Sequence, residues 1–160
     1  MKRAIILFLI SLFLSCQSPD KPMTKAERSA IEKIIIAKHQ KMSESSSHLD
    51  ADAVWSHFVG NDSGIFAIEG KLTLSRDEAL NSARTSYGNL KEMHTKMQQE
   101  YATVLSPESA VFTGTGIVDG VLKSGDSFEV PFAITVVYVL RDGDWKAIHM
   151  HESTPNMPEL

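Results

Sequence analysis

In the C-terminal half of the chain, apolar and polar residues alternate over long runs, which predicts β-strands. From Phe128 to Leu140 every even-numbered residue is apolar, whereas the odd-numbered residues include Glu129 and Pro131. Successive side chains of a strand point to opposite faces, so the even-numbered set is expected to face the core. Four long strands are expected at residues 93–105, 110–118, 128–140 and 145–153, separated by turn residues such as Asp-Gly and Ser-Gly-Asp.

The N-terminal half shows the spacing of a helix instead. Thr24 and Glu27 form a capping box, in which each side chain accepts a hydrogen bond from the other residue's backbone N–H. Apolar residues then recur at helical spacing. They are Ala30, Ile31, Ile34, Ile35 and Met42. The helix is expected to fade over residues 43–47, because four of these five residues are serines, which are poor helix formers.

Two shorter helices and one short strand are expected next. Asp50 is a suitable N-cap for a helix over residues 51–58. Residues 65–68 predict a strand, and residues 69–71 its turn. A second capping box, from Ser75 to Glu78, opens a helix that closes at Gly88.

The order helix, helix, strand, helix and four strands predicts the α+β class. Helices collected before a run of strands are not typical of an alternating parallel α/β fold. A cone-shaped, curved antiparallel sheet wrapped around the long first helix would bury its isoleucines. Such a cone leaves a cavity where the helices meet the concave face, a usual position for a ligand site.

The first residues predict an export signal. Lys2 and Arg3 precede a mostly apolar run of eleven residues, 4–14. This run is too short to span a bilayer, which needs about 20 residues, but it suits a secretory signal peptide over residues 1–15.

Phe13-Leu14-Ser15-Cys16 resembles the lipobox of bacterial lipoproteins. The resemblance implies that Cys16, the only cysteine, carries lipid and becomes the first mature residue. An ordinary signal peptide that ends near an unmodified cysteine is the alternative. Gln17 stands where lipoproteins retained at the inner membrane have Asp, so the resemblance implies a location in the cell envelope, anchored to the outer membrane and facing the periplasm. Residues 16–23, with two prolines, are expected to be the tether.

Composition narrows the remaining possibilities. The chain of 160 residues has a net charge of −4 and no long basic stretch, so nucleic acid is not expected as a partner. One cysteine excludes an internal disulfide and a multi-cysteine metal site. A single domain is expected over residues 24–154, with a tail at 155–160.

The element order and the residues of the last hairpin resemble the nuclear-transport-factor-2-like superfamily, which includes SnoaL-like and ketosteroid-isomerase-like domains. The hairpin, with Asp142-Gly143-Asp144-Trp145 and His149-Met150-His151, is similar to the end of the association domain of calcium/calmodulin-dependent kinases. The resemblance implies a cone with a pocket and a two-fold dimer formed by the outer sheet face. The superfamily contains enzymes, ligand binders and assembly modules, so fold alone does not choose among them.

Two turns could close the last hairpin, and they place opposite side chains in the pocket. A two-residue turn at 142–143 would pair Arg141 with Asp144 and turn Trp145, His149 and His151 inward. A three-residue loop at 141–143 would pair Leu140 with Asp144 and turn Ile148, Met150 and Glu152 inward. Burial preferences favour the three-residue loop. The resemblance agrees, because pocket arginines of kinase association domains match Val136 and Glu152.

With this register, Glu152 is the candidate general base, since a carboxyl facing an apolar cavity has a raised pKa. Its alternative is a solvated position at the rim. Tyr87, Tyr101 and Tyr138 could each donate a hydrogen bond to a ligand carbonyl, and Tyr138 lies on the strand expected to form the pocket. The other expected pocket residues are Phe132, Ile134, Val136, Ile148 and Met150.

The outer face is expected to be a mixed patch that forms a homodimer. Its residues are Thr135, Trp145, Ala147, His149 and His151. His149 and His151 could supply two metal ligands, but a zinc site needs at least three protein ligands. No metal and no cofactor are therefore expected.

The leading functional hypothesis is an envelope-anchored homodimer that binds a small, mostly apolar, neutral molecule without transforming it. Arginines are missing at Val136 and Glu152, so anionic ligands are disfavoured. One alternative is an isomerase, cyclase or dehydratase with Glu152 as general base and a tyrosine that stabilises an enolate. Another is an oligomerisation module with a vestigial pocket.

Overall fold

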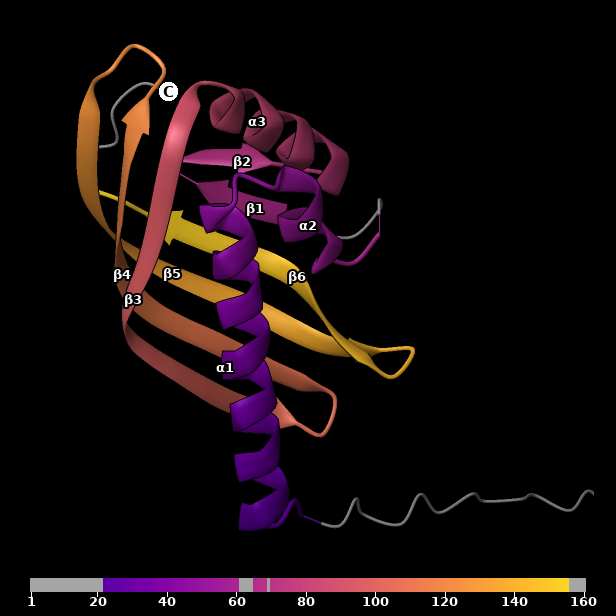
Figure 1. The fold of residues 1–160 in the computed structure, drawn as a ribbon. Coiled ribbons are helices and arrows are strands. Elements are labelled where there is room, and N and C mark those ends of the chain that lie inside the picture. Colours follow the sequence, from indigo (N-terminus) through magenta and orange to yellow (C-terminus); the bar gives the residue numbers. More distant parts are fainter. Residues whose placement is uncertain (1–21, 61–64, 69, 156–160) are drawn as a thin grey trace, which may run out of the picture.

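The computed structural model describes residues 22–60, 65–68 and 70–155, and it confirms the α+β class. A long helix, α1 (Lys25–Ser47), lies across the concave side of a curved, unclosed sheet (Figure 1). Two shorter helices, α2 (Ala51–Ser56) and α3 (Arg76–Gly88), cover one end of it. No helix in the described part of the chain is long and apolar enough to cross a membrane.

The sheet has six strands in the order β2-β1-β6-β5-β4-β3. The four long strands form the predicted antiparallel meander. They are β3 (Leu90–Ser106), β4 (Ser109–Leu122), β5 (Ser127–Arg141) and β6 (Asp144–Ser153). The predicted short strand is β1 (Ile65–Ile68), which pairs with β6 in parallel. A further strand, β2 (Lys71–Thr73), begins inside the predicted turn and pairs with β1.

The helices begin at the predicted caps. The Thr24 hydroxyl accepts from the Glu27 N–H at 3.2 Å, and the Glu27 carboxylate accepts from the Thr24 N–H at 2.7 Å. The first helix does not fade at residue 43 but continues to Ser47. Its last serines make tertiary hydrogen bonds, since Ser46 Oγ lies 2.8 Å from the Tyr87 hydroxyl and Ser47 Oγ accepts from the Thr95 N–H at 3.0 Å. Such contacts outweigh low helix propensity.

The core lies between α1 and the inner face of the sheet. Ile35 and His39 of α1 are buried against this face, together with Phe112 and Tyr138. The even-numbered residues of β5 from Val130 to Tyr138 are all buried, as the alternation predicts.

The last hairpin differs from the prediction at its turn. Arg141 pairs with Asp144, so the loop has two residues, and the predicted three-residue loop is wrong. Asp142 and Gly143 have φ angles of 51° and 79°. Two positive φ angles are typical of a type I′ turn, whose twist matches that of the strands it joins.

A β-bulge then reverses the inward and outward positions of β6. Tyr138 pairs with Ala147, whereas the preceding Val137 pairs with His149, so Ile148 is an extra residue. An unpaired residue shifts the alternation by one position. Before the bulge Trp145 and Ala147 face the core, with exposed fractions of 6% and 0%.

The predicted position of Trp145 and Ala147 on the outer face is therefore wrong. Beyond the bulge Met150 and Glu152 are on the inner side, and His151, paired with Thr135, is on the outer side with His149. Ile148 is half-buried at the bulge.

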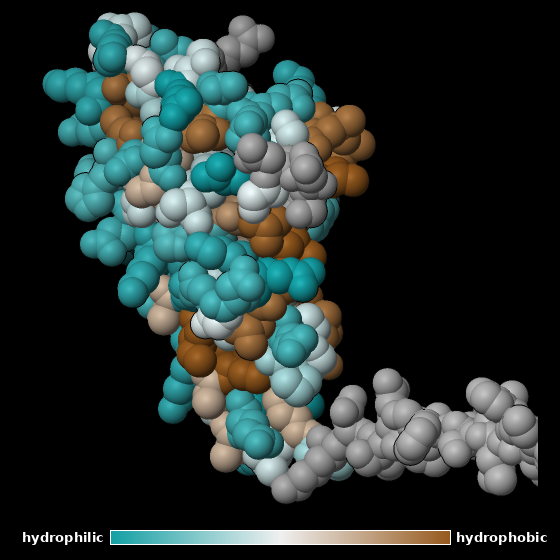
Figure 2. Space-filling model, turned by 90° about the vertical axis from the view of Figure 1, so that its right-hand side faces the viewer, coloured by the Kyte–Doolittle hydropathy of each residue, from teal (hydrophilic) through white to brown (hydrophobic). Residues whose placement is uncertain are grey.

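Most of the surface in Figure 2 is hydrophilic, with separate apolar areas. Among the described residues, six large apolar side chains are exposed. Three of them, Ile65, Leu72 and Leu74, belong to or adjoin β1 and β2. Lys71 and Thr73 alternate with these leucines and line the cavity described below. Ile65, which pairs with His149, and Leu72, which pairs with Ala67, therefore lie on the outer face of this sheet edge, opposite the cavity.

Glycines on the inner face of β4 make room for aromatic rings from β5. A Cβ on Gly116 would lie 2.7 Å from Cζ of Phe132 and 2.7 Å from the backbone oxygen of Lys96. Gly120 is similarly covered by Phe128. These glycines let large side chains lie flat against the curved sheet.

We expect Gly116→Ala to lower the free energy of unfolding by about 1–3 kcal/mol, because the added methyl group overpacks the core against backbone. Chemical denaturation in urea measures this change. Gly88→Ala is the control, because nothing lies within 4 Å of that Cβ position. Equal stability of the two variants would contradict the close packing at Gly116.

Candidate functional site

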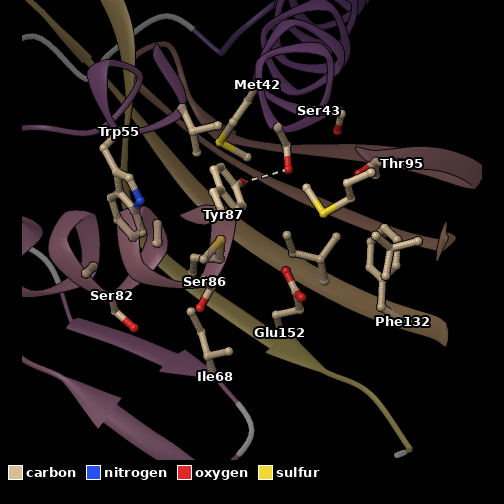
Figure 3. A pocket seen from close by; sticks show the side chains of 18 of the residues that line it. Met42, Ser43, Trp55, Ile68, Ser82, Ser86, Tyr87, Thr95, Phe132 and Glu152 are labelled. Carbon is tan, nitrogen blue, oxygen red and sulfur yellow. Dashed lines mark hydrogen bonds between the residues drawn. The ribbon is translucent and has the colours of Figure 1, made fainter. Parts of the chain in front are cut away.

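A cavity of about 590 Å³ lies between the three helices and the inner face of the sheet (Figure 3). This volume is within the range of about 300–1,000 Å³ that is typical of small-molecule sites. The expected position, where helices meet the concave face, is thus occupied by a cavity large enough for a ligand.

The cavity has a hydroxyl-bearing wall and an apolar wall. The helices contribute Ser43 and Ser46 from α1, and Ser82 and Ser86 from α3. Residues three or four positions apart lie on one side of a helix, so each pair is presented together. The sheet contributes mainly large apolar side chains: Leu90, Met93, Val118, Phe132, Ile134 and Met150. A molecule with a polar edge and an apolar face would match both walls.

Four of the residues predicted for the pocket line it: Phe132, Ile134, Met150 and Glu152. Val136 and Tyr138 are fully buried in the core instead, and neither lines the cavity. The Tyr138 hydroxyl lies 3.5 Å from Nδ1 of His39, and burial raises the pKa of this tyrosine. Tyr138 is therefore not placed to contact a ligand, and its predicted catalytic position is wrong. Ile148 is also absent from the lining, because it is the bulged residue.

Tyr87 takes the place predicted for Tyr138. It projects from the end of α3 into the cavity, and its hydroxyl is 2.8 Å from Ser46 Oγ (Figure 3). Burial is the main cause that raises the pKa of Tyr87, and the negative charge of Glu152 raises it further, whereas the hydrogen bond with Ser46 lowers it. Tyr87 is therefore a neutral hydroxyl at physiological pH, close enough to Glu152 to be affected by its charge.

Glu152 reaches the cavity from β6, where it pairs with Ile134. Figure 3 shows its carboxyl group directed into the space below Tyr87. Among the described residues of the lining, Glu152 is the one acidic side chain and Lys71, exposed at the edge, is the one lysine or arginine. The interior part of the described lining therefore carries a hydrogen-bond acceptor and no lysine or arginine that would attract an anion.

His39 also lines the cavity, but it is a weak base. Its ring stacks on Phe112 with centroids 3.7 Å apart, and only 1% of the residue is exposed. Burial, with a smaller contribution from the charge of His57, lowers the pKa of His39 to about 3. Such an imidazole is neutral and poorly matched to proton abstraction near neutral pH.

Trp55 of α2 lines the end of the cavity opposite Phe132 (Figure 3), and the sequence analysis did not identify it. One tryptophan in a short helix gives no periodic signal, and its role depends on where α2 docks. The backbone oxygen of Trp55 accepts from Nε of Arg76 at 2.7 Å, which ties α2 to the start of α3. Arg76 and Trp55 are 21 residues apart in sequence.

No metal site is apparent in the described ranges. They contain no group of three or more His, Cys, Asp or Glu side chains that could hold an ion. His149 and His151, on the outer side of β6, lie away from the cavity lining. Cys16 is outside the described residues.

Several solved structures have the same fold. A nuclear transport factor 2 (NTF2-like) superfamily protein from Salmonella enterica serovar Typhimurium superposes with a TM-score of 0.73 at 15% identity, over 82% of this chain and 96% of that one. A structure from Xanthomonas campestris, described as a calcium/calmodulin dependent protein kinase II association domain, superposes with a TM-score of 0.66 at 21% identity. The match covers 79% of this chain and 87% of that one. A hexachlorocyclohexane dehydrochlorinase, LinA-type3, from Novosphingobium barchaimii superposes with a TM-score of 0.71 at 16% identity. The match covers 86% of this chain and 94% of that one.

No curated protein matches this chain in sequence at a significant level. The sequence model of one protein family, the SnoaL-like domain, does match this chain, over residues 35–157. This match runs from the buried part of α1 past the end of β6 and includes every strand of the cone. The chain belongs to the SnoaL-like domain family.

Proposed function

We propose that this domain binds a small, neutral, mostly apolar molecule in its cavity. The observation that carries the proposal is the cavity itself, which combines an apolar sheet wall with a hydroxyl-bearing helical wall. Burial of apolar ligand surface against the sheet supplies about 25 cal/mol per Å². The serine hydroxyls, which donate and accept, then orient the polar edge of the ligand.

Charge supports a neutral ligand. An anion in this cavity would lose hydration and would lie near the Glu152 carboxylate, with no arginine in the described lining to compensate. Val136 and Glu152 stand where the resemblance to kinase association domains puts arginines. The one lining lysine, Lys71, is exposed at the cavity edge.

N-phenyl-1-naphthylamine, a neutral probe that fluoresces in apolar surroundings, tests binding. We expect the purified protein to enhance its fluorescence, and Ser86→Trp to weaken binding by about tenfold or more because the indole fills the cavity. Thr85→Trp is the matched control, since Thr85 is the exposed neighbour on α3 outside the lining. A saturable signal that is identical in both variants would place binding elsewhere.

A second candidate is an isomerase, cyclase or dehydratase in which Glu152 is the general base. The observation that favours it is the presence of Glu152 and the neutral Tyr87 hydroxyl in one cavity. The carboxylate would take a proton from carbon next to a carbonyl, while the hydroxyl donates to the oxygen that gains negative charge. The Novosphingobium neighbour is described as a dehydrochlorinase, so this fold also accommodates elimination chemistry.

Exchange of the acidic C–H protons of 2-tetralone in D2O, followed by NMR, separates the two candidates. If Glu152 is a base, the protein accelerates exchange and Glu152→Gln slows it by about 10²-fold or more. Glu129→Gln, on an exposed position of β5, should leave the rate unchanged. If the protein binds the naphthylamine probe but the protons of 2-tetralone exchange no faster than in buffer, the role of Glu152 as a base is contradicted and the binding function stands.

We further propose that lipid on Cys16 anchors the protein to the outer membrane, facing the periplasm, and that it forms a homodimer. The lipobox resemblance supports the anchor. For the dimer, Thr135, His149 and His151 remain on the outer side of the sheet after Trp145 and Ala147 are assigned to the core.

Both proposals are tested with a variant in which residues 1–16 are replaced by the cleavable signal peptide of a soluble periplasmic protein, which removes the acyl acceptor together with the original apolar leader. We expect the unchanged protein in the outer-membrane fraction and the variant in the soluble periplasmic fraction, where its sedimentation should give twice the mass of one chain. A variant that still sediments with membranes would contradict anchoring through Cys16. A monomer would contradict the dimer.

A further inference from the structure

The indole of Trp55 is held in a fixed place on the cavity wall. Only 4% of the residue is exposed. Its ring packs against Phe58, with centroids 4.5 Å apart, and edge-on against Phe66, with centroids 4.9 Å apart. Together with the hydrogen bond from Arg76 to the Trp55 backbone, this packing leaves the ring little freedom to rotate.

The indole N–H has no hydrogen-bond acceptor among the described residues, although it is buried. A buried donor without an acceptor costs about 1–3 kcal/mol, and native proteins satisfy nearly all of them. Figure 3 shows the nitrogen-bearing edge of the ring turned toward the cavity, on the side of Tyr87 and Ser86. The N–H therefore faces the space that a ligand would occupy.

We propose that Trp55 Nε1–H is a specificity-determining donor, and that the ligand carries a carbonyl oxygen that accepts this hydrogen bond. The inference rests on the proposed binding function and names the chemical class of the ligand. An indole N–H donates and cannot accept, so its partner is an acceptor. A carbonyl oxygen is a neutral acceptor, which suits a cavity that has Glu152 in its lining and an apolar sheet wall.

The nitrogen has less than 1 Å² of exposed surface, so a ligand oxygen would reach it only after the adjacent lining shifts. Met42 and Met150 are among the lining residues. Methionine side chains are unbranched and change shape at low cost, which allows such an adjustment. The polar edge of the ligand would then extend from Trp55 toward the helical hydroxyls.

Two probes of the same ring system test the proposal: 2-acetylnaphthalene, which has a carbonyl, and 2-ethylnaphthalene, which has none. Each is titrated against bound N-phenyl-1-naphthylamine. Trp55→Phe keeps an aromatic ring and removes the N–H, so we expect it to weaken acetylnaphthalene about five- to tenfold and ethylnaphthalene less than about twofold. Trp145→Phe, the same change at a buried position outside the cavity lining, should alter neither.

A second measurement needs no change at Trp55. The chain has two tryptophans, so its indole N–H groups give two NMR signals, and Trp145→Phe identifies the signal of Trp55. We expect acetylnaphthalene to move the Trp55 signal downfield and ethylnaphthalene not to do so, because a new hydrogen bond deshields the proton.

The outcomes separate the two proposals. Equal weakening of both probes by Trp55→Phe, or equal shifts of the Trp55 signal with both, would overturn the role of the N–H while leaving the binding function intact. Failure of both probes to displace the naphthylamine from the unchanged protein would overturn the proposed function, and this inference with it.

Discussion

The packing of α1 against the inner face of β4 and β5 is the interaction on which the rest of the structure depends. Ile35 and His39 are almost completely buried there, with Phe112 and Tyr138 beneath them. This contact covers one part of the concave face and lets the last turns of α1 extend over the part that stays open. The open part is the cavity. This packing keeps His39 neutral, because a charged imidazole in the core would lose its hydration without a compensating anion.

The two walls of the cavity are held by different forces. The sheet wall is a ladder of backbone hydrogen bonds from β3 to β6, interrupted only at bulges such as Ile148, and this ladder sets the spacing of its apolar side chains. The helical wall is held by fewer polar contacts, including Arg76 to the Trp55 carbonyl and Arg84 to Asp52 between α3 and α2. Exposed ion pairs such as Arg84–Asp52 add little stability. The helical wall therefore depends mainly on the packing of its apolar side chains, such as that of Trp55 against Phe58 and Phe66.

Local signals in the sequence predicted most of the fold. Capping residues at Thr24 and Ser75 marked two helix starts, and alternation along β5 identified its inner face, because caps and pleats depend on near neighbours. The bulge at Ile148 was not predictable, since it depends on how β6 meets β5 and β1. Because the bulge was left out of the prediction, two errors followed: the turn was given three residues, and Trp145 and Ala147 were placed on the outer face. Met150 and Glu152 face inward as predicted, but for a different reason. The turn is one residue shorter than predicted and the bulge adds one unpaired residue, so the two changes in register cancel.

The site was less predictable than the fold, because it joins residues from all three helices and from distant strands. Glu152 was placed in the cavity only because the error in the turn offset the unpredicted bulge, and Tyr87 and Trp55 acquire their positions only when α3 and α2 dock. Tyr138 shows the converse. It lies on the correct face of the correct strand, yet α1 covers it, so the position along a strand decides between core and cavity.

The bulge has a consequence for how this strand tolerates changes in length. Ile148 is one residue more than the ladder requires. Removing it would restore regular pairing with Ala147, Met150 and Glu152 still on the inner side, whereas straightening the strand with Ile148 retained would turn His149 and His151 into the cavity. The bulged pairing, rather than the extra residue itself, thus keeps a carboxylate and not the imidazoles in the interior. Deletion of Ile148 would therefore leave the cavity lining as it is, whereas loss of the bulge with the residue retained would exchange one face of the strand for the other.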